Sequence, residues 1–179
     1  FAPYGNLIYA EGWERYEDLG PDSLFQFSVQ QNYHIYMSKI DYAERYGPEW
    51  ARVDPPVDGE GFAAYPAEEV EATALAYFGA PADYLRTAYS YDAQKNVYQM
   101  RGGGLGEEWW PRVLSAEREG DLLRISYEVW TEGYAVRDGE GNASEASGQK
   151  VYSAVMTVEL LDGGGFQYRS VQVLPEEAA

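Results

Sequence analysis

The residues best suited to binding chemistry lie in one glycine-rich segment near the middle of the chain. It reads Gly102-Gly103-Gly104-Leu105-Gly106-Glu107-Glu108-Trp109-Trp110-Pro111. Exposed tryptophan rings stack on sugars or peptides, and carboxylates accept hydrogen bonds from hydroxyl groups. We therefore treat Glu107, Glu108, Trp109 and Trp110 as candidate ligand-binding residues for a glycan or a peptide. The structural alternative is that both tryptophans are buried, as large aromatics usually are, and anchor a loop between two hairpins.

Two loop patterns lack a residue that their chemistry requires. The glycines at 102–106 are typical of a phosphate-binding loop, but no Lys-Ser/Thr ending follows them and two glutamates would repel phosphate. The segment 138–145 alternates oxygen-bearing side chains as a calcium-binding loop does. Its sixth position is Ala143 and its twelfth is Gln149, where such a loop has Gly and Glu. We expect 138–145 to be a solvated loop between strands.

The composition excludes several catalytic and metal sites. The absence of cysteine excludes disulfides, thiolate metal sites and a cysteine nucleophile. His34 is the only histidine, which excludes a metal centre built on several histidines, and the chain has no Gly-x-Ser-x-Gly elbow. We therefore predict no metal and no cofactor, and assign no catalytic residue. Glycoside hydrolysis by a pair of carboxylates is not excluded, because 30 acidic residues always include some pair at a suitable separation.

Charge restricts the partners. With 13 Lys and Arg against 30 Asp and Glu, the net charge is −17, which repels phosphate backbones and anionic lipid headgroups. Nucleic acid is therefore not expected as a partner. No apolar stretch approaches the length of about 18 residues that spans a bilayer, so direct membrane insertion is not expected either. Cations and basic proteins remain possible partners.

The first part of the chain is predicted to be helical. Residues 1–58 read as helix and loop, with a helix over about 22–45, although Leu24, Phe27 and Val29 also alternate as in a strand. Clustered Pro and Gly indicate a linker at 59–66. Helices are expected over 67–86, the first between Pro66 and Gly79 with two glutamates in its first turn.

From residue 87 to 174 the apolar pattern has a period of two, which predicts strands. Three hairpins are expected, with turns at 92–96, 119–121 and 162–165. Helices followed by about six antiparallel strands in meander order define an α+β fold in one domain over 1–179. Curved sheets of the cystatin-like or nuclear-transport-factor-like kind have this order of elements.

The second half of the chain resembles uncharacterised exported domains of gut Firmicutes, which are typically tethered to the membrane as lipoproteins. The resemblance covers about residues 66–174 and rests on the segments 69–71, 77–79, 84–86, 96–98, the glycine-rich loop and 163–170. It implies an extracytoplasmic, membrane-tethered bacterial protein, and it carries no functional residue with it.

Three functional hypotheses follow. The first is a non-enzymatic extracytoplasmic binding or interaction module of a bacterial envelope protein, with a glycan, a peptide or a basic envelope protein as its partner. The second is a glycan-active, enzyme-like pocket domain that uses carboxylates for acid–base work. The third is an acidic inhibitor of envelope hydrolases, which would present its negative surface to a basic groove.

Overall fold

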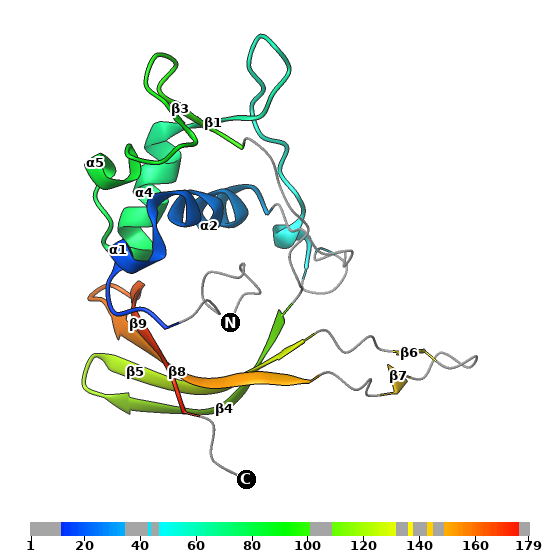
Figure 1. Cartoon of the computed structure of the whole chain (residues 1–179), viewed down its shortest axis with the longest axis vertical. Coiled ribbons are helices and arrows are strands. Elements are labelled where there is room, and N and C mark those ends of the chain that lie inside the picture. The colour runs from blue at the N-terminus through cyan, green and yellow to red at the C-terminus, as the bar shows by residue number, and fades with distance from the viewer. Residues whose placement is uncertain are drawn as a thin grey trace.

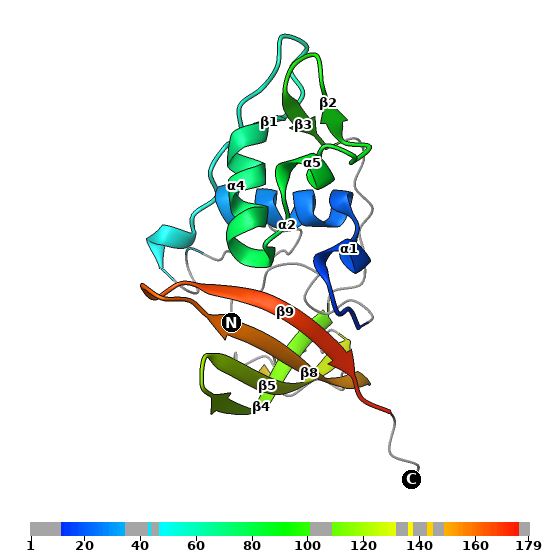
Figure 2. The ribbon, with the colours of Figure 1, turned by 90° about the vertical axis from the view of Figure 1, so that its left-hand side faces the viewer.

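The fold consists of helices over one face of an antiparallel sheet, with a second, smaller sheet beyond the helices (Figures 1 and 2). The computed structural model describes residues 12–34, 43, 47–100, 109–131, 136–137, 143–144 and 149–175. The helical layer contains α1 (Tyr16–Leu19), α2 (Pro21–Tyr33), α4 (Ala67–Phe78) and α5 (Ala82–Leu85), and a 3₁₀ turn, η1, covers Pro48–Trp50. The predicted α+β class is confirmed, because helices come first and antiparallel strands follow.

The larger sheet has the strand order β4-β5-β8-β9, with antiparallel neighbours throughout. Its strands are β4 (Trp109–Glu119), β5 (Leu122–Thr131), β8 (Lys150–Leu160) and β9 (Phe166–Val173). The hairpins predicted around 119–121 and 162–165 are both present. Between β5 and β8, β6 (Val136–Arg137) and β7 (Ala143–Ser144) form a two-residue ladder.

The remaining strands form a separate sheet with the order β1-β3-β2. These strands are β1 (Ala64–Pro66), β2 (Tyr91–Asp92) and β3 (Val97–Gln99). The hairpin predicted around 92–96 is present, and Asn96 adopts a positive φ in its turn. The prediction of one continuous curved sheet was wrong, because β3 pairs with β1 and β2 and does not join β4. Strand β1 was not predicted; it lies at the end of the segment 59–66 that was expected to be a linker.

Helix boundaries follow the backbone signals at their ends. Helix α4 lies between Pro66 and Gly79, and Gly79 adopts the left-handed conformation that ends a helix (φ 69°). The helix predicted over 22–45 is shorter, because His34 takes a left-handed conformation directly after α2 (φ 50°). Residues 35–42 and 44–46 lie outside the described part of the chain. The strand alternative for Leu24, Phe27 and Val29 was wrong, since all three lie on buried positions of α2.

A single hydrophobic cluster joins the helices to the larger sheet. The sheet contributes alternate residues of β5 and β8, as the period of two predicted: Ile125, Tyr127, Val129, Ala154, Met156 and Val158. Phe27 of α2 contacts Tyr77 and Phe78 of α4 and Tyr168 of β9 at ring-centroid distances of 5.4, 4.9 and 6.1 Å. The helical layer is therefore fixed to the β9 side of the sheet.

Candidate interaction surface

The structure describes only part of the site predicted from the sequence. Glu107 and Glu108 lie outside the described residues, as do the glycines before them. Trp109 and Trp110 are the first two residues of β4, where they pair with Thr131 and Trp130 of β5, and only their backbone is described. The binding role of these four residues therefore stays a prediction.

Strand β4 is an outer strand of the larger sheet and is open to solvent along most of its length. It has 11 residues and pairs with β5 alone among the described strands. Every residue from Arg112 to Glu119 is exposed, including Val113 at 46% and Leu114 at 55%. In Figure 2 the helices lie next to β9, and the end of β4 that leads into β5 lies at the bottom of the sheet, away from them. A row of backbone N–H and C=O groups on such an edge is available to another strand.

The opposite edge of the same sheet, at β9, is covered at Val171 by the chain itself. Trp13 and Val171 exchange two backbone hydrogen bonds, each with an N···O distance of 2.8 Å. Gly12 permits this close approach, since a Cβ atom on it would lie 2.8 Å from the carbonyl oxygen of Val171. The indole of Trp13 is buried and contacts Phe78, which holds the segment in place. The larger sheet thus has an edge at β9 that is covered at Val171 and an edge at β4 that pairs with no second described strand.

The exposed strand has a charge pattern unlike that of the whole chain. β4 contains Arg112 and Arg118 against Glu117 and Glu119, which gives it a net charge of zero in a chain of net charge −17. On the face of the sheet away from the helices, Arg112 lies opposite Glu128 and Glu117 lies opposite Arg124. Opposite charges facing each other across strands stabilise a sheet, and like charges destabilise it. A strand that pairs with β4 must match this pattern.

An irregularity lies in the middle of the edge strand. The pairing of β4 with β5 shifts register between Val113 and Ser115, so Leu114 is an extra residue in a β-bulge. Because of the bulge, Val113 and Ala116 both lie on the helix-side face, opposite buried residues of β5. Bulges, prolines and charges are common on edges that must not pair at random. β4 therefore restricts which strands can pair with it.

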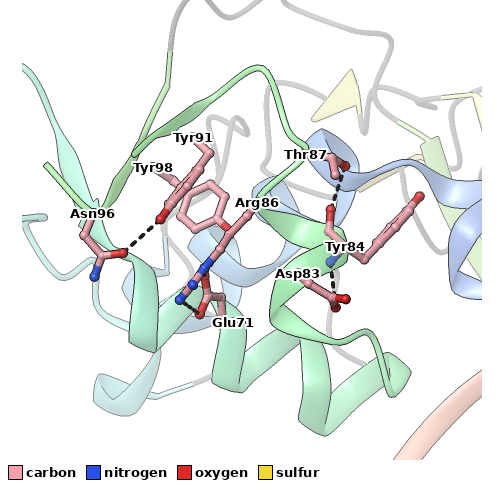
Figure 3. Close-up of polar contacts among 8 residues, drawn as sticks. All are labelled: Glu71, Asp83, Tyr84, Arg86, Thr87, Tyr91, Asn96 and Tyr98. Atoms are coloured by element: carbon pink, nitrogen blue, oxygen red, sulfur yellow. Dashed lines mark hydrogen bonds and ion pairs between the residues drawn. The ribbon is translucent and has the colours of Figure 1, made fainter. Parts of the chain in front are cut away.

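The buried carboxylate of Glu71 has a structural role in the helical layer (Figure 3). Glu71 is 8% exposed, and its two oxygens accept hydrogen bonds from Nε and Nη2 of Arg86 at 2.7 and 3.0 Å. The hydroxyl of Tyr98 also donates to it, at 3.4 Å, and burial together with this carboxylate raises the pKa of Tyr98. Arg86 in turn lies 5.9 Å from the ring centroid of Tyr91. The side chain facing Glu71 is a cation, so the arrangement is not that of two catalytic carboxylates.

The carboxylate of Asp58 joins two loops next to the small sheet. It accepts hydrogen bonds from the backbone N–H groups of Glu60 and Phe62, at 2.9 and 3.0 Å. It also accepts from Nζ of Lys95 and Nε2 of Gln99, both at 3.0 Å. The hydrogen bond from Lys95 is the main reason that the pKa of Asp58 falls to about 2. These contacts join the loop before β1 to the β2–β3 hairpin.

The other chemistry considered from the sequence finds no support among the described residues. They contain no group of three or more His, Asp or Glu side chains arranged to hold a metal ion. His34 contacts the backbone carbonyl of Ala51 through Nδ1, at 3.0 Å. In the part of the chain with described geometry, no helix is long and apolar enough to cross a bilayer. Exposed acids occur on helices and sheet alike, among them Glu17, Asp18, Glu68, Asp83, Glu117 and Asp162, so they do not form a single acidic face.

Comparison with known proteins gives no relative. No family model matches the chain, and no significant match is found among curated proteins or solved structures. The candidate surface therefore rests on the geometry of the chain alone.

Proposed function

We propose that this chain is a non-catalytic interaction module that binds a polypeptide by adding a strand to the free edge of β4. The observation that carries the proposal is the contrast between the two edges of the larger sheet. The β9 edge is paired with Trp13 at Val171, whereas β4 is exposed from Arg112 to Glu119. Strand addition of this kind derives affinity from main-chain hydrogen bonds and specificity from alternate side chains.

The side chains of β4 favour pairing with a specific partner strand over pairing with any strand. Val113 and Leu114 offer apolar contact, and they are flanked by charged residues of both signs. A partner strand with apolar residues on the helix-side face and alternating charges on the other face would match both the apolar and the charged residues of β4. As part of the same proposal, the module belongs to a bacterial envelope protein outside the cytoplasm, as the resemblance of residues 66–174 implies.

The test uses prolines, which remove one backbone N–H donor each. Of two successive strand residues, one N–H points to the neighbouring strand and the other points away. Ala116→Pro and Glu117→Pro should therefore differ: one should lose thermal stability and the other should remain folded with an altered free edge. Peptide binding is then compared between wild type and the variant that remains folded, because that variant lacks an N–H donor on the free edge.

The probe is a displayed library of random twelve-residue peptides, selected on the wild-type chain. We expect the selected peptides to slow amide hydrogen exchange in residues 112–119 and to bind the folded proline variant at least about tenfold more weakly. An alanine substitution at the turn residue Asp162 serves as the matched surface control. Equal binding to wild type and to the edge proline variant would refute strand addition at β4.

A further inference from the structure

We infer that the strand added to β4 is β4 of a second copy of this chain, so that two sheets join edge to edge in a two-fold dimer. This inference rests on the proposed function and names its partner. A two-fold axis perpendicular to the sheet places the two β4 strands antiparallel, as an isologous interface requires. Eleven residues extend over about 36 Å at about 3.3 Å per residue.

The faces of β4 select the register of this pairing. Residues that face each other across two antiparallel strands must lie on the same face of the sheet. Arg112 and Glu117 both lie on the face away from the helices, and Val113 and Ala116 both lie on the helix side. The faces of all four residues match when Arg112 of one copy lies opposite Glu117 of the other, which also places Val113 opposite Ala116. Shifting the register by one residue pairs opposite faces.

Charge complementarity supports the same register. Within one chain Arg124 of β5 lies opposite Glu117 of β4, and Arg112 of β4 lies opposite Glu128 of β5. Across the two-fold axis, Glu117 of one copy would meet Arg112 of the second copy. The result is a row Arg124, Glu117, Arg112 and Glu128 that crosses both copies with alternating sign and occurs twice by symmetry. Nζ of Lys150 lies 3.9 Å from Glu128 and continues the alternation.

Because β4 carries no net charge, two chains of net charge −17 can associate through it. Repulsion between distant surface charges is screened over about 8 Å at physiological ionic strength. The groups that come into contact are those of β4, and they sum to zero. A basic partner would gain from the overall charge of the chain but would meet Arg112 and Arg118 on the strand itself. The strand therefore favours a copy of itself over a basic protein.

The test is a charge swap read by sedimentation velocity. Wild type should pass from monomer to dimer between about 10 µM and 1 mM, the range for a small interface. Arg112→Glu places two glutamates opposite each other at both ends of the interface, and Glu117→Arg does the same with arginines. Each variant should dimerise about tenfold more weakly than wild type.

Mixing the two variants is the decisive step. In a mixed dimer, the new glutamate of one chain faces the new arginine of the other, and the native Glu117 faces the native Arg112. The equimolar mixture should therefore dimerise within about threefold of wild type while each variant alone does not. Arg118→Glu is the control, since it changes the charge of β4 equally but faces Pro111 in this register. Circular dichroism of dilute samples shows whether each variant is folded.

The possible outcomes separate this inference from the proposed function. A wild type that stays monomeric up to about 1 mM overturns the dimer, and so does a mixture that does not recover. If the selected peptides still bind at β4 in that case, the proposed interaction module stands, but its partner is not a second copy of the chain. If changes in β4 weaken neither dimerisation nor peptide binding, both proposals are refuted.

Discussion

At the scale of single residues, polar contacts in this chain hold the fold together. Glu71 with Arg86 and Asp58 with Lys95 each join segments that are far apart in the sequence. Tyr33 likewise donates a hydrogen bond of 2.5 Å from α2 to Glu69 on α4. Glu68 and Glu69 were expected at the start of a helix, and both lie in the first turn of α4. Their partners could not be predicted, because contacts between distant segments leave no local pattern.

The stabilising effect of Asp58 should depend on pH. The pKa of its carboxyl group in the folded chain is about 2, below the ordinary value of 3.8. Its contribution to stability is therefore complete above about pH 4 and is lost as the pH falls through about 2. Urea unfolding of wild type and Asp58→Asn should show a difference in unfolding free energy that shrinks over this range. The exposed Asp54, changed to Asn, is the control; a difference that is constant with pH would contradict the assignment.

At the scale of elements, hairpins and short helices were predictable and sheet membership was not. The alternation of Leu123, Ile125, Tyr127 and Val129 identifies β5 and its inner face from local spacing alone. Whether β3 continues into the larger sheet or pairs with β1 depends on residues about 30 positions apart. The edge position of β4 depends on that choice, so it could not be read from the sequence.

The contacts between Phe27 and three rings should be an important link of α2 to α4 and β9. Phe27 is buried, and replacing it with Ala leaves a cavity among Tyr77, Phe78 and Tyr168. We expect Phe27→Ala to lower the free energy of unfolding by about 3–5 kcal/mol. Phe62, which is 63% exposed, should change it by less than about 1 kcal/mol when replaced with Ala. Chemical denaturation measures both, and similar losses would contradict this account of the core.

The covered edge at β9 should open when Gly12 gains a side chain. A Cβ atom on Gly12 would lie 2.8 Å from a backbone oxygen of β9, so the segment must move away from the strand. We expect Gly12→Ala to cost about 1–3 kcal/mol and to speed amide hydrogen exchange at Trp13 and Val171. Gly59→Ala is the matched control, because its Cβ would meet nothing within 4 Å. Unchanged exchange at both amides would show that the edge is not held in this way.

At the scale of the whole molecule, dimerisation should make stability depend on protein concentration. A partner that binds only the folded chain stabilises it by mass action. If the dimer forms through β4, raising the concentration to about ten times the dissociation constant leaves about a fifth of the chain as monomer and should raise the melting temperature by about 2–4 °C. Arg112→Glu should show a much smaller rise over the same range. Scanning calorimetry at several concentrations checks this, and parallel curves for both proteins would contradict it.

The paired backbone of Trp13 and Val171 also bears on how the chain acquires its structure during synthesis. Domains generally fold as units while the ribosome adds residues from the N-terminus onward. The helices α1 and α2 are made first, yet Trp13 obtains its strand partner only when position 171 has been added. Until β9 is made, Trp13 has no strand to pair with and Phe27 lacks its contact with Tyr168. The nascent chain should therefore expose aromatic surface to chaperones until β9 emerges.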